Sequence, residues 1–129
     1  VALLSFSNFG NPIRPSSKNI REAVNILIER KVNFEFDGEM TAEVALDYDL
    51  IKENYPFCRL SDSANVLIMP GLLSANISFK LLQSLGGGSV LGPLMIGGEK
   101  PFQIVQMGSS VSDIVNSASV AAYNSIYSK

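Results

Sequence analysis

Two polar residues, Ser74 and Asn76, lie where the sequence pattern places the end of a strand and the start of a helix. Residues 66–69 form a continuous apolar run, which is typical of a strand buried on both faces. Pro70 and Gly86 then mark the start and the end of a helix. Because open α/β sheets bind ligands where strand carboxyl ends meet helix amino ends, we expect ligand contacts near Ser74 and Asn76.

The other residues that could do chemistry have simpler interpretations. Asp37 and Glu39 could act as an acid and a base, but an Asp-Gly-Glu sequence before a helix is better explained as a turn. Cys58 is the single cysteine and has no histidine to activate it, so we predict a partly buried, small hydrophobic side chain. With no histidine and one cysteine, this chain supplies neither a zinc site nor a histidine-based triad.

Two glycine runs and one acidic residue complete this set. The glycines at 86–88 and 97–98 lack the spacing of a phosphate-binding loop, and no Lys-Ser or Lys-Thr follows them, so turns and a helix stop explain them. Ser110 and Asp113 match a capping box before an apolar run, which predicts a helix towards Tyr127. The cap alone explains Asp113, and any ligand role needs a separate argument.

The composition excludes several classes of partner. The 129 residues are 47% hydrophobic and 17% charged, which is more apolar material than one small domain needs and indicates a partner surface. A net charge of −2 without a basic stripe argues against nucleic acid and anionic membranes. Proline and glycine interrupt the apolar runs before they reach the roughly 20 residues of a membrane span. We expect a cytoplasmic protein, and the apolar start at Val1 suggests a piece of a longer chain.

Strands and helices alternate along the chain. The helix at 17–30 has its apolar residues at i, i+3, i+4 and i+7, whereas residues 32–37 alternate as a strand does. The pattern predicts strands at 1–7, 32–37, 66–69, 89–98 and 99–108, and helices at 17–30, 41–54, 70–86 and 110–127. This indicates an α/β fold, a layered sheet that is partly parallel with an antiparallel strand and is flanked by helices.

Short motifs recur in order from the first strand to the last helix: LSFS at 4–7 with Gly10, DGE at 37–39, ANVLIMP at 64–70, SANI at 74–77 with Lys80, Gly92 with Pro93, and GSSVSDIVN at 108–116. In these motifs the chain resembles the carboxyl-terminal portion of the phosphate acetyltransferase and butyryltransferase family. The resemblance implies an isocitrate and isopropylmalate dehydrogenase-like fold, with two α/β domains around a cleft and a dimer formed through them. It also implies that residues 1–129 are the carboxyl-terminal portion of a longer acetyltransferase-like domain.

The chain departs from the family at the expected anion site. The acetyltransferases carry Ser-Arg-Gly where this chain has Gln106, Met107 and Gly108, and Thr-Lys where it has Asn8 and Phe9. At Met107 a thioether therefore replaces a guanidinium, which removes a fixed positive charge and a set of paired N–H hydrogen-bond donors. Loss of one such group costs on the order of 10²-fold in rate or more.

With these departures, the sequences at 55–60, 86–88 and 103–108 make the chain most similar to the acetyltransferase-like tail domain of large bacterial malic enzymes. This similarity implies a parent chain that oxidatively decarboxylates malate with NADP and a divalent metal, both held outside this domain. It implies a tail that is not itself catalytic, senses acetyl-CoA as an allosteric effector and supports a homo-oligomer, at least a dimer.

The resemblance also implies a pocket for acetyl-CoA or a related acyl-CoA, in which Asn76 and Asp113 would hold the pantetheine or acetyl end. Two alternatives stay open. A working phosphate acetyltransferase, making acetyl phosphate and CoA, would use Asp113 as the base, and Met107 counts against it. A purely structural oligomerisation domain would have lost its ligand. The expected pocket residues are Ser7, Asn8, Ser74, Asn76, Gly92, Pro93, Gln106 and Asp113.

Overall fold

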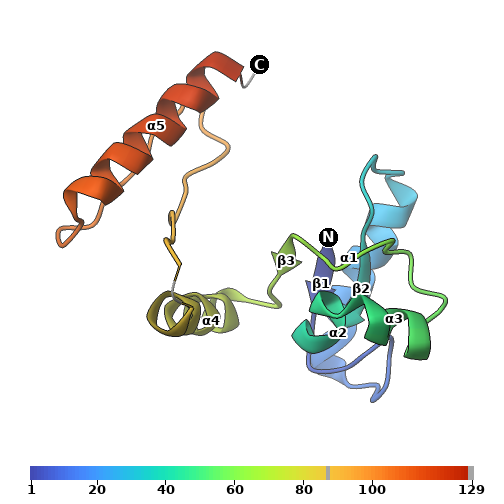
Figure 1. Ribbon diagram of the computed structural model, residues 1–129. Coiled ribbons are helices and arrows are strands. Elements are labelled where there is room, and N and C mark those ends of the chain that lie inside the picture. Colours follow the sequence, from blue (N-terminus) through green and yellow to red (C-terminus); the bar gives the residue numbers. More distant parts are fainter. Residues whose placement is uncertain (87, 128–129) are drawn as a thin grey trace. The chain divides into compact units, whose positions relative to one another are not determined.

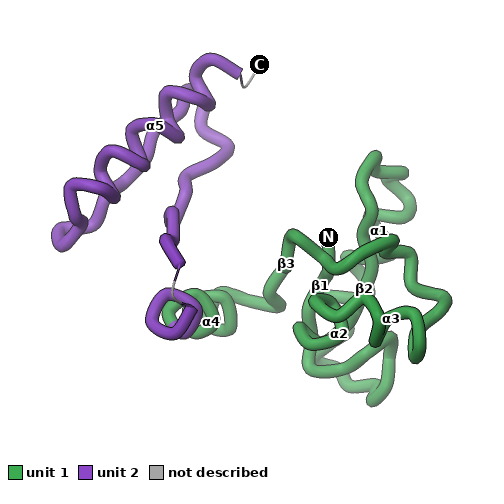
Figure 2. Tube along the Cα trace, in the orientation of Figure 1, with its two compact units in different colours: residues 1–80 green, residues 81–129 purple. Residues whose placement is uncertain are grey.

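The computed structural model describes residues 1–86 and 88–127. The chain divides into two compact units, Val1–Lys80 and Leu81–Lys129, which are coloured separately in Figure 2. Each unit is described by itself below.

A three-stranded parallel sheet forms the centre of the first unit (Figure 1). Strand β1 (Ala2–Leu4) lies between β2 (Asp37–Met40) and β3 (Leu67–Ile68), with Ala2 in register with both Asp37 and Leu67. All three residues of β1 are buried, as its apolar sequence predicts.

Helices cover both faces of this sheet. A 3₁₀ turn, η1 (Pro15–Ser17), leads into α1 (Lys18–Glu29), whose buried face packs with Leu3. On the other face, α2 (Ala42–Leu46) and α3 (Tyr48–Asn54) pack with Ala2 and Leu4. Because successive strand residues point to opposite faces, β1 contributes to two cores. The predicted α/β class, with helices flanking a sheet that is at least partly parallel, is confirmed.

Three predictions in the first unit are wrong. The strand predicted at 32–37 is displaced, and the predicted turn at Asp37 and Glu39 is strand β2, in which both acidic residues are buried. The helix predicted at 41–54 is divided at Asp47, whose carboxylate accepts a hydrogen bond from the Leu50 N–H at 3.0 Å and caps α3. Asp47 favours this break because its short polar side chain competes for nearby backbone N–H groups.

The predicted strand at 66–69 is shorter and less buried than expected. Only Leu67 and Ile68 pair with β1, and Ile68 is 45% exposed. Helix α4 (Leu72–Leu85) follows and ends before Gly86, as predicted, whereas Gly87 lies outside the described residues.

The second unit has one long helix, α5 (Val111–Tyr127), which starts at the predicted capping box. The two strands predicted at 89–98 and 99–108 are wrong, and so is the antiparallel strand, because the strands in the described ranges are all parallel. A strand needs a neighbouring ladder, whereas the Met95 backbone bonds to the Gln103 side-chain amide at 3.0 and 3.3 Å. Across residues 1–86 and 88–127, no helix is long and apolar enough to span a membrane.

Candidate functional site

The loop after β1 is tied to β2 by hydrogen bonds on both of its predicted ligand residues. Ser7 is buried, and its hydroxyl donates to Glu39. The Asn8 side-chain oxygen accepts from the Thr41 N–H at 2.7 Å, and the Phe9 N–H donates to the Glu39 carbonyl at 2.7 Å. The loop therefore has a fixed conformation at the carboxyl ends of β1 and β2, where α/β folds place ligand sites.

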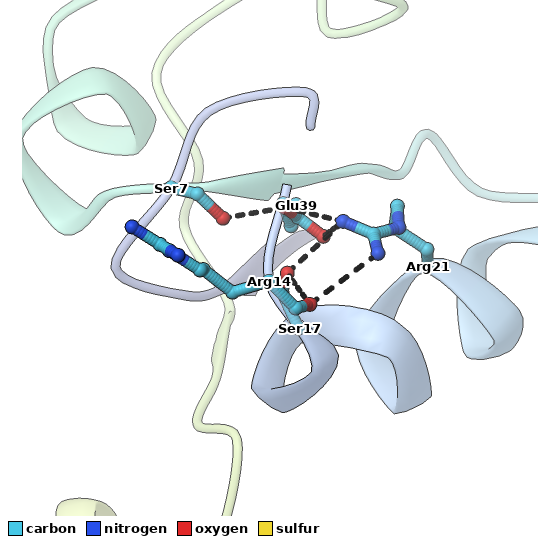
Figure 3. A network of polar contacts seen from close by, with 5 residues as sticks. All are labelled: Ser7, Arg14, Ser17, Arg21 and Glu39. Carbon is cyan, nitrogen blue, oxygen red and sulfur yellow. Dashed lines mark hydrogen bonds and ion pairs between the residues drawn. The ribbon is translucent and has the colours of Figure 1, made fainter. Parts of the chain in front are cut away.

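Glu39 is the centre of this network (Figure 3). Its side chain is fully buried, and Ser7 and Arg21 approach it from opposite sides. Arg21 Nη1 lies 3.1 and 3.3 Å from the two carboxylate oxygens and donates to Ser17 Oγ at 3.0 Å. Ser17 Oγ in turn donates to the Arg14 carbonyl at 3.1 Å. These partners orient the carboxylate, and through Ser7 the Glu39 side chain holds the loop after β1 in position.

Asp37 has a matching arrangement at the other end of β2. Arg59 Nη2 lies 2.9 Å from Asp37 Oδ1, and the Arg59 N–H donates to Oδ2 at 2.8 Å. The Gly38 N–H also donates to Oδ1, at 2.9 Å. A buried charge needs a counter-charge and hydrogen bonds, and each acidic residue of β2 has both.

A cavity of about 340 Å³ opens beside these ion pairs. Its walls come from α1, from β2, and from the segments around Phe9 and Phe57. The lining residues are Phe9, Arg21, Val24, Asn25, Ile28, Asp37, Gly38, Glu39, Phe57 and Arg59.

Ser74 and Asn76 lie in the first turns of α4, as predicted. The Ser74 hydroxyl donates to the Gly71 carbonyl at 2.8 Å, and the Asn76 side chain is exposed. Cys58 is partly buried, as predicted, and this burial raises the pKa of its thiol.

The four remaining predicted residues belong to the second unit. Gly92 has a φ of +130° before Pro93, and the Gln106 carbonyl accepts from the Ser109 N–H at 3.0 Å. Asp113 Oδ2 accepts from the Ser110 N–H at 2.9 Å and from the Ser110 hydroxyl at 2.8 Å. These two bonds, the backbone one first, lower the pKa of the Asp113 carboxyl.

The eight predicted residues therefore divide between the units. The structure brings Ser7 and Asn8 together on one loop, places Ser74 and Asn76 on α4, and places the other four in the second unit. Their joint pocket stays a prediction. Sequence reasoning missed Arg21, Phe57 and Arg59, although acidic residues at i and i+2 on a strand would have required such cationic partners.

No group of three or more His, Cys, Asp or Glu side chains in the part of the chain that the structure describes could hold a metal ion.

Comparisons with known proteins agree along nearly the whole chain. The family profile described as phosphate acetyl/butaryl transferase matches residues 1–122. An NADP-dependent malic enzyme of Rhizobium meliloti is 55% identical over 124 residues, covering 96% of this chain and 16% of that protein. A phosphate acetyltransferase of Treponema pallidum is 40% identical over 97% of this chain and 38% of that protein.

A solved phosphotransacetylase structure from Streptococcus pyogenes matches with a TM-score of 0.89 and 32% identity, covering 98% of this chain and 39% of that one. This chain thus spans about a sixth of the malic enzyme and less than two fifths of the transferases.

Proposed function

The chain belongs to the phosphate acetyl/butaryl transferase family, and from this we propose that it is a non-catalytic regulatory and oligomerisation domain of an NADP-dependent malic enzyme that binds acetyl-CoA as an allosteric effector. The decarboxylation of malate, NADP and a divalent metal belong to a catalytic domain of the same polypeptide, outside residues 1–129. The malic enzyme relatives support this because they contain the present region as a small part of a longer chain.

The residue that carries the proposal is Met107. It is fully exposed beside the Gln106 carbonyl turn, at the position where the transferases are expected to have an arginine. A thioether cannot stabilise the charge that develops on a thioester during transfer. Affinity for acetyl-CoA does not require that group, because binding and rate depend on different interactions.

Asp113 fits the proposed binding role. The Ser110 hydrogen bonds lower the pKa of its carboxyl, so the side chain is held as a carboxylate. Its carboxylate is suited to capping α5 and to accepting hydrogen bonds from a ligand.

We propose that the effector contacts the predicted residues, and that residues 1–129 are the carboxyl-terminal part of an isocitrate dehydrogenase-like domain. The predicted contact residues are Ser7, Asn8, Ser74, Asn76, Gly92, Pro93, Gln106 and Asp113. Calorimetry of acetyl-CoA with the full-length protein addresses this directly. We expect saturable binding of acetyl-CoA. Asn76→Ala should weaken this binding about tenfold, because it removes an amide that would form a hydrogen bond with the ligand. Asn19→Ala, an exposed amide on α1, is the matched control. An absence of binding up to millimolar acetyl-CoA would refute the proposal.

Allosteric regulation needs a second measurement, because coupling requires an effector that binds two states differently. We expect acetyl-CoA to inhibit malate-dependent NADP reduction by the full-length protein, and Asn76→Ala to shift the inhibition curve by the factor by which it weakens binding. An inhibition curve that Asn76→Ala leaves unchanged would mean that the effector binds at another site.

A working phosphate acetyltransferase is the second candidate, and the extent of the match to a phosphate acetyltransferase favours it. Asp113 would then be the base acting on the CoA thiol. Formation of acetyl-CoA from acetyl phosphate and CoA at an appreciable rate would replace the regulatory proposal.

A purely structural oligomerisation domain is the third candidate. None of the described residues of α4 and α5 is buried, and Leu72, Leu73, Leu85 and Val111 expose most of their side chains. Such surfaces usually mark contacts. Light scattering would show a dimer or a larger homo-oligomer, whereas a monomer at high concentration would exclude this role.

A further inference from the structure

The cavity beside β2 presents cations to solvent although each cation has an acidic partner. The Arg21 side chain is 32% exposed and Glu39 is completely buried, while Arg59 is 44% exposed and Asp37 only 5%. A molecule that enters this cavity of about 340 Å³ therefore meets guanidinium groups before it meets carboxylates.

Both guanidinium groups keep unused donors. Arg59 bonds to Asp37 through Nη2 alone, and Arg21 uses Nη1 for Glu39 and Ser17 and makes one long contact of 3.5 Å from Nη2 to the Arg14 carbonyl. A guanidinium has five N–H donors. The acidic partners are also satisfied by neutral donors, Ser7 for Glu39 and two backbone N–H groups for Asp37. Each arginine can therefore bind an anion without leaving its ion pair.

Two aromatic side chains, Phe9 and Phe57, also line this cavity. Phe57 is 64% exposed and makes an edge contact with Phe9, with ring centroids 4.9 Å apart. Asn25, one helical turn beyond Arg21 on α1, adds an exposed amide to the lining. An exposed aromatic ring can stack on a nucleobase, and a nearby arginine fork can bind its phosphate. The cavity size lies within the range of about 300–1,000 Å³ that is usual for small-molecule sites.

We propose that this cavity holds the nucleotide end of an acyl-CoA, with the adenine ring against Phe57 and a phosphate on the unused donors of Arg21 and Arg59. The proposal rests on the proposed function, because it assumes that acetyl-CoA is the effector. The cavity adjoins the predicted ligand loop: Phe9 follows Asn8 directly, and Glu39, which lines the cavity, bonds to Ser7.

The opposing explanation is that the ion pairs only close the outer edge of the sheet, since charged side chains protect edge strands from pairing. That explanation accounts for the four charged residues of the two ion pairs. Ring contacts with Phe9 and Tyr55 hold Phe57 in place, but they leave it 64% exposed in the lining of the cavity. The two explanations differ in whether the nucleotide part of CoA contributes to affinity.

The experiment compares acetyl-CoA with acetyl-pantetheine, which lacks the nucleotide, by calorimetry on the full-length protein. We expect acetyl-CoA to bind at least tenfold tighter. Phe57→Ala and Arg59→Lys should each weaken acetyl-CoA about tenfold and change acetyl-pantetheine less than twofold. Arg59→Lys keeps a cation beside Asp37, so the fold survives, and Phe34→Ala, a partly exposed phenylalanine outside this cavity, is the matched control.

The outcomes separate the two proposals. Equal affinities for the two ligands, or variants that weaken both ligands alike, would overturn the nucleotide site while acetyl-CoA binding itself still stands. If neither ligand binds up to millimolar concentration, both the effector role and this site are refuted.

Discussion

Removal of the Arg21 side chain should destabilise the first unit through the carboxylate that it leaves behind. Arg21→Met keeps much of the side-chain volume but leaves fully buried Glu39 with Ser7 as its remaining side-chain partner. Breaking a buried ion pair from one side costs about 3–5 kcal/mol. Because Arg21 is 32% exposed, water partly replaces it, and we expect about 3 kcal/mol, the lower limit of that range.

Hydrogen exchange measures this loss where it occurs. The Ser5 N–H donates to the Met40 carbonyl and the Phe9 N–H to the Glu39 carbonyl, so these amides report opening between β1 and β2. A loss of about 3 kcal/mol corresponds to exchange roughly 150-fold faster.

Glu39→Gln provides the decisive comparison, because its effect should change sign with the background. In the wild type it weakens a charge-assisted pair and destabilises by about 1–2 kcal/mol. In Arg21→Met it removes an uncompensated buried charge and should stabilise by a similar amount. If Arg21→Met costs less than about 1 kcal/mol, as an exposed pair would, or if Glu39→Gln destabilises both backgrounds equally, the reasoning is refuted.

Two further predictions concern β2 and the start of α5. Gly38→Ala should destabilise the first unit by at least about 3 kcal/mol, because its new Cβ would lie 2.6 Å from the Leu3 carbonyl oxygen and the backbone φ there is +154°. Chemical denaturation measures this loss, and a variant as stable as the wild type would contradict the prediction. The pKa of Asp113 should lie below its ordinary value of 3.8, so the stability it contributes is complete above 3.8 and is lost as the pH falls through the lower folded-state pKa. Carbon NMR titration of the carboxyl measures it, and Ser110→Ala, which removes one donor, should raise the pKa; an unchanged value would contradict the cap as its cause.

Short-range sequence patterns correctly predicted those helices and strands that are determined by residues close together in the sequence. The stripe at Ile20 and Val24, the apolar run of β1, and the Ser110 and Asp113 capping box each lie within one element, and the structure has all three. The predicted strands at 89–98 and 99–108 failed because an apolar run becomes a strand only when a neighbour pairs with it. In the described part of the second unit, the Gln103 side chain pairs with the Met95 backbone instead.

The candidate site was less predictable because its partners are distant in sequence. Asp37 and Glu39 are acidic residues on either side of a glycine, which is also the composition of a turn. Their burial depends on Arg59, 22 residues after Asp37, and on Arg21, 18 residues before Glu39. No window of a few residues contains both members of either pair, so short-range patterns favoured the turn.

The two units differ in how they could serve binding and catalysis. In the first unit, buried groups hold the loop of Ser7 and Asn8 in place, and such preorganisation favours a bound ligand whether or not it reacts. In the second unit, the residues that a transferase would need are a methionine and a carboxylate whose pKa is lowered by its own helix cap. Interactions that bind substrate and transition state equally give affinity without rate. This difference between the two kinds of group is the physical basis on which we propose that the chain senses a thioester rather than transferring its acyl group.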